Sequence, residues 1–454
     1  MLPRGEAIRN FVYSGSLDLL ASEAQLTVQS VYPSDEIVDL LVERYGSVHE
    51  LPALHVPRQV GVARALVAEA HNRMLWSAAA RDRHLRRVEE APTRAARLKA
   101  RSWQILGRPF ASPGRTQFLG DLEQWISAHS SGSVMTAELL DKSAPSLVFN
   151  ASHVHADNAM DTVHQAKRRG LRVATFLFSW DNLTSQGRIS PEYNHYLVWN
   201  EQIGQDLRAL YPRVSAESVT VTGTPQFDPH FWPDQHLSRR EVCDRIGADP
   251  SRPLVLYTTG MANHMPHEPE IVEALARSLG ERADLGKPQV VLRVYAKDRS
   301  GRFEHLRGRL DNLVEMPVLW EPNWLTPLPE DSVLWSSVLA AVDCGVNVAS
   351  TVSLELAMFD KPVVNVGYSP PSLRNPALDY ARYYRFDHYW PILESGAVTV
   401  AGSHEGAVDA IAEAIRRPDH QRSARAELLS TVFGSTLDGK SHARVASTLL
   451  ELAR

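Results

Sequence analysis

The feature that most constrains this chain is the alternation of short apolar runs with longer amphipathic segments. The short runs are rich in Val, Leu and Phe, as in buried parallel strands, and the longer segments have the spacing of covering helices. The pattern predicts an α/β fold. Strands are expected in the first half at Arg9–Tyr13, Gln25–Val31, Ser146–Asn150, Arg172–Phe178, Tyr196–Trp199 and Ser218–Thr222. The second half continues the series with Leu254–Thr258, a helix at Glu268–Gly280, Gln289–Tyr295, Val333–Val342, Gly345–Val348, a helix at Ser353–Phe359, and Val363–Val366.

The length indicates two large domains, because 454 residues are about three times a usual ~150-residue domain. The stretch from Phe227 to Pro253 contains four prolines and a charged helical pattern, which is typical of an interdomain connection. We place the boundary near His236. The expected domains are 1–235, with a basic helical insertion at about 75–118, and 236–454, whose last helices can pack back on the first domain.

Composition excludes several classes of protein. The formal charge of −5 argues against a general nucleic-acid binder. Cys243 and Cys344 lack CxxC spacing, so neither a disulfide framework nor a cysteine zinc site is expected. No signal-peptide pattern and no long uncharged apolar run occurs, which predicts a cytoplasmic protein, either free or peripheral on the inner face of the membrane.

One region differs from the rest in charge. Between Arg81 and Arg115 the sequence has ten Lys/Arg and three Asp/Glu, interleaved with apolar residues such as Trp103 and Ile105. A helix of this kind can lie on an anionic bilayer or face an anionic acceptor. The alternative is an ordinary solvated basic helix.

Polar segments follow several of the predicted strands, and ligands of parallel α/β sheets bind at the carboxyl ends of strands. The segments are NASHVHADN, FSWDNLTSQGR, VTGTPQFD and NVASTVSLELAMFDKPVVNVG. No GxGxxG and no Walker A loop is among them, so a dinucleotide dehydrogenase or a P-loop NTPase loses its main support. In the last segment Ser350 or Thr351 can cap a helix whose amides bind phosphate, and Glu355 can bind a ribose diol. The alternative for Glu355 is a structural capping box.

Four segments between Ser146 and Val445 resemble GT-B glycosyltransferases, in particular bacterial surface-polysaccharide glycosyltransferases and CDP-glycerol glycerophosphotransferase-like proteins. STVSLELAMFDKPVVNV resembles the donor-site segment, and VTGTPQFDPHF is similar to the VxGxPxxD element that ends the N-terminal domain. FSWDNLTSQGR with LVWNEQ resembles a loop of bacterial surface-carbohydrate transferases, and DGKSHARV resembles a closing DGKAxxR segment. The resemblance implies two Rossmann-like domains with parallel sheets facing across a cleft.

The resemblance also implies a donor pocket in the C-terminal domain. Gly260 would let the backbone approach the diphosphate, and Arg293 and Lys297 would neutralise the leaving group, unless they pair with surface carboxylates. No paired-glutamate element of the common retaining enzymes precedes the Lys-Pro, which leaves the stereochemical outcome open. The candidate donor-site residues are Gly260, His264, Arg293, Lys297, Ser350, Thr351, Ser353 and Glu355.

The acceptor side is expected in the N-terminal domain, where a His or Asp on a strand-end loop can act as general base. One candidate group is His153, His155 and Asp157, and the alternative is that these histidines only form loop hydrogen bonds. The other candidate is Asp181, which with Asn182 can instead cap a turn. Trp180 is either a wall for a sugar ring or a core residue.

His264 and His267 precede a helix with Glu268 and Glu270, which superficially suggests a metal site. Pro266 and Pro269 make the first turn irregular, so a loop of the donor pocket, with His264 near a phosphate or sugar, is the better interpretation. The alternative is a plain helix boundary. No metal and no bound cofactor is expected, because the nucleotide-sugar is a co-substrate.

The favoured activity is metal-independent transfer of a sugar from a nucleotide-activated donor to an acceptor hydroxyl of a glycan, a lipid-linked sugar or a small molecule. Two other enzyme classes stay open: transfer of a polyol phosphate from a CDP-activated donor, and UDP-sugar 2-epimerisation. A sugar-nucleotide-binding protein without catalysis is the non-enzymatic alternative.

Overall fold

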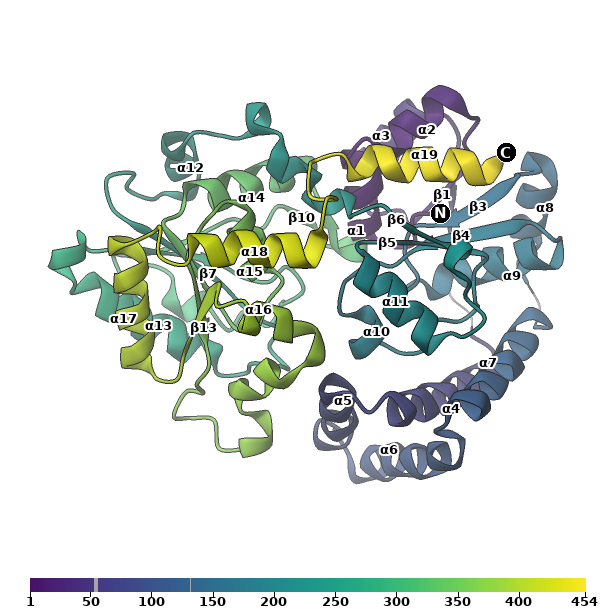
Figure 1. Ribbon diagram of the computed structural model, residues 1–454, viewed down its shortest axis with the longest axis horizontal. Coiled ribbons are helices and arrows are strands. Elements are labelled where there is room, and N and C mark those ends of the chain that lie inside the picture. Colours follow the sequence, from purple (N-terminus) through teal and green to yellow (C-terminus); the bar gives the residue numbers. More distant parts are fainter. Residues whose placement is uncertain (53–55, 131) are drawn as a thin grey trace. The chain divides into compact units, whose positions relative to one another are not determined.

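The computed structural model describes residues 1–52, 56–130 and 132–454, and its chain divides into two compact units. The first unit consists of Met1–Gln226, Pro322–Thr326 and Lys440–Arg454, and the second of Phe227–Glu321 and Pro327–Gly439. The change of unit therefore falls at Gln226 and Phe227 rather than near His236. Figure 1 shows the elements of both units along the chain.

The second unit is built on a six-stranded parallel sheet with the order β14-β13-β12-β7-β8-β9. Numbered along this unit, the order is that of the doubly wound dinucleotide-binding fold, 3-2-1-4-5-6. The strands are β7 Leu254–Thr258, β8 Gln289–Arg293, β9 Leu313–Glu315, β12 Cys344–Asn347, β13 Val363–Val366 and β14 Val398–Ala401, with the short β10 Trp320–Glu321 and, at the boundary, β11 Thr326–Pro327. The helices are α12 Arg239–Ile246, α13 Glu268–Gly280, α14 Pro329–Ala341, α15 Val352–Met358, α16 Trp390–Glu394, α17 His404–Arg416 and α18 Arg422–Phe433.

Burial explains why these segments form strands and helices. Every residue of β7, β8, β12 and β13 is buried, as expected for central parallel strands covered on both faces. The core joins the strand side chains to the apolar faces of α13 and α17. In addition, α15 packs against β12 and is itself covered by α18.

The first unit contains a four-stranded parallel sheet in the order β3-β4-β5-β6 and a parallel pair β1-β2. The strands are β1 Val28–Ser30, β2 Val48–Glu50, β3 Leu147–Asn150, β4 Arg172–Phe176, β5 His195–Val198 and β6 Val219–Val221. The helices are α1 Gly5–Ile8, α2 Ser16–Glu23, α3 Asp35–Tyr45, α4 Arg58–Leu75, α5 Ala78–Glu89, α6 Arg94–Gly107, α7 Pro113–Ala128, α8 Val134–Ser143, α9 Met160–Arg168, α10 Asn182–Ser185, α11 Glu201–Leu210 and α19 Ser441–Ala453.

Two predicted strands are wrong, Arg9–Tyr13 and Val333–Val342. Arg9–Tyr13 is helical, continuing α1 as a wider turn, and not extended. Ile8, Phe11 and Val12 are fully buried, and their spacing of three and four residues is that of one helix face. The apolar run Val333–Val342 likewise lies largely in α14.

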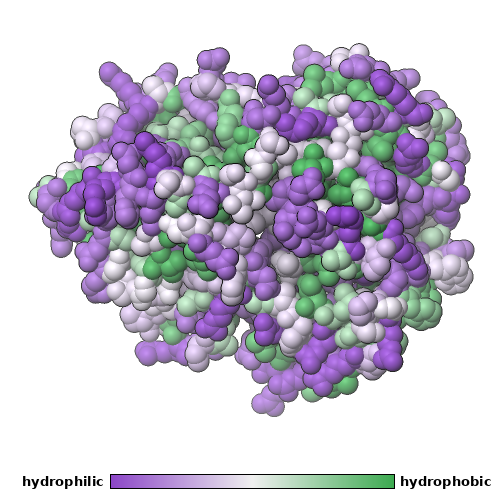
Figure 2. Space-filling view, viewed as in Figure 1, coloured by the Kyte–Doolittle hydropathy of each residue, from purple (hydrophilic) through white to green (hydrophobic). Residues whose placement is uncertain are grey.

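Helices dominate the region that the sequence marks as basic. They extend beyond the expected insertion at 75–118, since α4 begins at Arg58 and α7 ends at Ala128. Figure 1 shows α4, α5, α6 and α7 grouped together, and Figure 2 shows hydrophobic and hydrophilic side chains side by side over this group. None of the helices in the described ranges is both long and apolar enough to cross a membrane.

Candidate functional site

The strand order of the second unit reverses between β7 and β12, because the chain leaves β7 toward β8 and leaves β12 toward β13 on the opposite side. Ligands of such sheets bind outside the carboxyl ends of the strands at this point. The loops there are 259–267, before α13, and 348–351, before α15. The structure thus places Gly260, His264, Ser350 and Thr351 at the position that the topology favours for a ligand.

A buried polar network shapes the loop after β12. The Asn347 side-chain oxygen accepts hydrogen bonds from the Ser350 amide at 3.2 Å, the Ser353 hydroxyl at 3.2 Å and the Asn365 amide nitrogen at 3.0 Å. The Ser353 hydroxyl also lies 2.9 Å from the Tyr389 hydroxyl, and Ser353 is fully buried. The Ser353 hydroxyl is therefore part of a buried hydrogen-bond network. Its contact with a phosphate stays a prediction that this geometry does not support.

Ser350 and Thr351 form the turn that leads into α15. The Ser350 hydroxyl accepts a hydrogen bond from the Val352 amide at 3.3 Å, and Ala349 has a positive φ of 40°. Thr351 is the N-cap residue, and its side chain makes no capping hydrogen bond. This turn differs from the capping box that was the structural alternative for Glu355.

Glu355 is held by two donors from distant parts of the second unit. Its Oε2 atom lies 3.1 Å from Nε2 of His230 and accepts a hydrogen bond from the Trp335 indole at 2.7 Å. The other nitrogen of His230 lies 2.8 Å from the Ser336 hydroxyl. Both contacts fall on Oε2, and no partner of Oε1 occurs among the residues that the structure describes. The carboxylate is thus oriented through one oxygen, and its side chain keeps 14% of its surface exposed.

The surroundings of Gly260 give a structural reason for a glycine at this position. Its amide donates to Oε2 of Glu268 at 2.9 Å, and its carbonyl accepts from Arg302 at 2.7 Å. A side chain at this position would meet the sulfur of Met265 at 2.5 Å. The missing side chain therefore makes room for Met265, and the Gly260 amide is already used by a carboxylate rather than open to a diphosphate.

Glu268 and Arg302 form a buried pair beneath this loop, with 3.0 Å between Nη2 and Oε2. Burial raises the pKa of Glu268 to about 7, and Arg302 opposes that rise. Glu268 also accepts a hydrogen bond from the Tyr257 hydroxyl at 3.2 Å. Arg302 bonds Asp298 and the carbonyls of Gly260 and Met265, so a single guanidinium fixes the loop after β7.

The two candidate cations, Arg293 and Lys297, have different surroundings. Arg293 is buried and bonds both carboxylate oxygens of Asp331, at 2.8 and 2.7 Å. Arg293 is thus paired with a carboxylate, which was the alternative to its binding a phosphate. Lys297 is half-buried, with its ammonium 5.9 Å from the centre of the Tyr295 ring. The ring of His264 stacks on that of Tyr383, and its carbonyl accepts from Arg382 at 3.2 Å.

In the first unit, the loops after β3 and β4 bring His155 and Asp181 each within electrostatic reach of His153. Burial lowers the pKa of His153 to about 4, and its Nδ1 lies 3.2 Å from the carbonyl of Phe176. His155 is exposed and has a positive φ of 50°, a conformation that is unusual for a residue other than glycine. Oδ2 of Asp181 accepts a hydrogen bond from Ser185 at 2.5 Å.

The remaining acceptor-side candidates have other surroundings. Asn182 is buried and its oxygen accepts from the Ser179 amide at 2.8 Å, which is the turn-closing role. Trp180 is half-buried in the same turn. Asp157 is exposed and pairs with Arg64 of α4 at 3.0 Å, apart from the Asp181 group.

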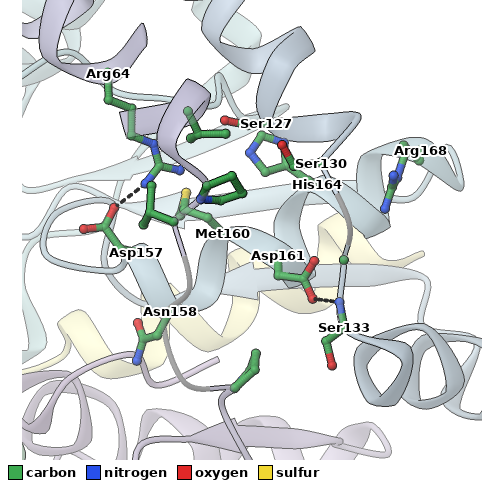
Figure 3. Close-up of a pocket in the computed structure, with 15 residues that line it drawn as sticks. Arg64, Ser127, Ser130, Ser133, Asp157, Asn158, Met160, Asp161, His164 and Arg168 are labelled. Atoms are coloured by element: carbon green, nitrogen blue, oxygen red, sulfur yellow. Dashed lines mark hydrogen bonds and ion pairs between the residues drawn. The ribbon is translucent and has the colours of Figure 1, made fainter. Parts of the chain in front are cut away.

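A cavity of about 280 Å³ lies next to Asp157 in the first unit. Figure 3 shows Arg64, Asp157, Met160 and His164 around it. Nε2 of His164 and Oδ1 of Asn158 are buried without a hydrogen-bond partner in the described part of the chain. The lining mixes hydroxyl, imidazole, guanidinium and carboxylate groups, which suits a ligand rich in hydroxyl groups.

Sequence reasoning missed three groups that the fold brings to these sites: the His230 and Trp335 partners of Glu355, the Arg302 pair of Glu268, and His164. His230 lies within VTGTPQFDPHF, so its segment was noticed but its partner was not. Of the DGKSHARV segment, Arg444 donates to the carbonyl of Thr222 at 2.8 Å, a structural contact within the first unit.

No family model and no curated protein matches the sequence. The structure is similar to that of UDP-GlcNAc 2-epimerase from Neisseria meningitidis bound to UDP-GlcNAc, with a TM-score of 0.54 and 10% identity over 98% of this chain and 97% of that one. A second UDP-N-acetylglucosamine 2-epimerase gives a TM-score of 0.52 and 13% identity over 98% and 92%. A glycosyltransferase from Rickettsia africae gives a TM-score of 0.48 and 11% identity over 98% and 96%.

The likeness to the two epimerase structures, together with the strand order, shows a GT-B-like α/β fold with two Rossmann-like domains. This confirms the fold class that the sequence predicted.

Proposed function

We propose that the chain is a nucleotide-sugar enzyme that binds its donor at the carboxyl ends of β7 and β12 and transfers the glycosyl group to an acceptor hydroxyl. The observation that carries the donor site is Glu355, whose Oε2 is anchored by His230 and Trp335, while Oε1 has no hydrogen-bond partner among the residues that the structure describes. A fixed carboxylate oxygen one turn into a helix at the switch point is suited to accept hydrogen bonds from a ribose diol.

Two further features support this proposal. Ser350 and Thr351 lie in the turn before α15, where their hydroxyl groups suit phosphate oxygens, and Lys297 follows β8 as a cation for the leaving diphosphate. In addition, the Neisseria meningitidis structure with the same fold is one bound to UDP-GlcNAc.

In the proposed reaction the acceptor oxygen attacks the anomeric carbon as the bond from that carbon to the diphosphate oxygen breaks. The acceptor proton passes to a base, for which His155 and Asp181 are the candidates, and the nucleoside diphosphate leaves with the bonding electron pair. His153 is an unsuitable cation at neutral pH because burial lowers its pKa to about 4. It can serve as a neutral hydrogen-bonding group.

UDP-sugar 2-epimerisation is the second candidate function, because the two structures with TM-scores of 0.54 and 0.52 are both UDP-GlcNAc 2-epimerases. An epimerase would change the configuration at C2 of the sugar without consuming an acceptor. Polyol-phosphate transfer from a CDP donor would release CMP. Proton NMR of the nucleotide-sugar after incubation, combined with chromatography of released nucleotides, separates the three.

A thermal-shift screen of UDP, GDP, CDP, CMP and dTDP tests the donor site itself. A ligand that binds only the folded state at about 100 times its Kd stabilises it by about 2.7 kcal/mol, so one base should raise Tm clearly above the others. If none of the five raises Tm at millimolar concentration, the nucleotide-sugar proposal is wrong. Binding without any turnover would favour the non-catalytic binding protein.

Replacing Glu355 by Gln should weaken the affinity for the stabilising nucleotide by about ten- to hundredfold, because a hydrogen bond to a charged group contributes about 1.5–3 kcal/mol. Gln keeps the volume and an acceptor oxygen, so Tm without ligand should change little. Isothermal titration calorimetry measures the affinity. The matched control is Trp335→Phe, which removes one donor to Oε2 but retains the carboxylate. Equal loss of affinity in both variants would mean that Glu355 acts only through packing.

A further inference from the structure

The helix α6 has its apolar stripe on the outside. Leu98, Ile105 and Leu106 are 64%, 61% and 54% exposed, whereas Ala100 and Gly107 face inward and are buried. Leu98 and Ile105 are seven residues apart and therefore lie on one side of the helix. A surface helix of a globular protein normally turns its apolar stripe toward the core, so this stripe calls for a partner outside the unit.

The next helix repeats the arrangement. Phe118, Leu122 and Trp125 of α7 are 63%, 41% and 61% exposed, and their spacing of four and three residues makes them one stripe. Leu119, between them in sequence, faces inward and is buried. Both helices pack on α4 through their inner sides, and Figure 2 shows hydrophobic side chains over the area where Figure 1 labels α6 and α7. Under the name outer apolar stripe we group two rows of exposed side chains, one on each helix: Leu98, Ile105 and Leu106 on α6, and Phe118, Leu122 and Trp125 on α7.

Unpaired cations flank the stripe. The segment Arg94–Gly107 of α6 contains four Lys/Arg and no Asp/Glu. Its cations and the two that follow it are exposed, and none has an ion pair among the residues that the structure describes: Arg94, Arg97, Lys99, Arg101, Arg108 and Arg115. On α5, by contrast, Arg86 pairs with Asp82, and Arg87 pairs with Glu69. The positive charges near the stripe are therefore exposed to solvent and not neutralised by carboxylates of the described residues.

We propose that the outer apolar stripe and its flanking cations dock the protein on an anionic lipid bilayer. Apolar side chains at the centre of an exposed face, with Lys and Arg beside them, match the layering of a bilayer surface, where acyl chains lie below anionic headgroups. A Trp within the stripe is typical of the interfacial region. A second copy of the chain fits less well, since two such faces would bring like charges together around the contact.

The test is co-sedimentation of the full chain with vesicles of phosphatidylcholine alone or mixed with phosphatidylglycerol, at low and high salt. We expect binding only to the anionic vesicles and a steep decrease with salt. Arg97→Glu with Arg101→Glu should reduce partitioning at least about twentyfold, because each cation near the surface contributes about fivefold. Leu98→Ser with Ile105→Ser should reduce it at least about tenfold, because each buried methylene contributes about fourfold.

Matched controls change the same residue types elsewhere. Leu19→Ser with Val42→Ser alters exposed apolar residues of α2 and α3, and Arg240→Glu with Arg245→Glu alters exposed cations of α12. These variants should bind anionic vesicles as the wild type does. The proposal is overturned if the wild type binds neither vesicle, if the controls lose as much binding as the α6 variants, or if sedimentation velocity shows that the α6 variants abolish self-association while vesicle binding is unchanged. Because the two α6 variants are independent and on the surface, at least one should keep the wild-type Tm.

Discussion

Replacing His155 by Ala, or Asp181 by Asn, should lower turnover of the nucleotide-sugar by about 10²–10⁴-fold while leaving its binding affinity near that of the wild type. Loss of a general base typically lowers the rate by this factor. Donor affinity should stay the same because neither residue belongs to the unit that carries the proposed donor site. His155 has a backbone conformation that costs energy, as residues held in place for function often do. Release of nucleoside diphosphate measures turnover, and calorimetry measures affinity.

The same loop provides the control for this pair of variants. Asp157 is exposed and bound by Arg64, so Asp157→Asn removes a carboxylate from the same loop as His155 and leaves His155 and Asp181 themselves unchanged. Its turnover should stay within a few-fold of the wild type. If His155→Ala and Asp181→Asn both turn over normally, the acceptor-side assignment is wrong. If Asp157→Asn alone is inactive, the base belongs to the cavity lined by Asp157 and His164.

The sheet of the second unit could be predicted closely from the sequence, whereas the first helices could not. Leu254–Thr258 and Val363–Val366 are short, mostly apolar runs that each follow a proline, and every residue in them is buried, as in central parallel strands. Arg9–Tyr13 contains the short apolar run Phe11–Tyr13, and such a run does not distinguish a strand from a buried helix by itself. Ile8, which extends the apolar spacing to a helix period, is the signal that a wider window would have found.

The sequence predicts which residues lie at the strand ends but not which of their atoms already have partners in the fold. Strand ends could be recognised, so Ser350, Thr351 and Gly260 were placed near the switch point. Which atoms remain open to a ligand depends on partners far apart in the chain, such as His230 and Glu355, 125 residues apart. No local pattern encodes that pairing. The same holds for Ser353, whose hydroxyl bonds Asn347 in a buried network, and for Arg293, which is paired with Asp331.

Replacing Arg302 by Met should destabilise the fold by about 3–5 kcal/mol, because it leaves the buried Glu268 carboxylate without its cation. Glu268 is fully buried, and the hydrogen bonds of Arg302 to Asp298 and to the Gly260 and Met265 carbonyls are lost as well. Denaturant unfolding at constant pH measures the change. The matched control is Arg307→Met, which breaks an exposed pair with Glu315 and should cost only ~0–1 kcal/mol.

The pH dependence of the stability lost in Arg302→Met tests whether the unpaired Glu268 carboxylate causes that loss. Burial raises its pKa in the folded protein to about 7, above the ordinary value of 4.5, so the folded state holds this proton more tightly than the unfolded state. Its contribution to stability is therefore greatest at low pH and declines as pH rises from 4.5 to 7. Without Arg302 the pKa of Glu268 must rise further, and the decline continues above pH 7. The Arg302→Met variant should thus lose more stability at pH 8.5 than at pH 6, and an equal loss at both values would mean that lost packing, not the unpaired carboxylate, explains the effect.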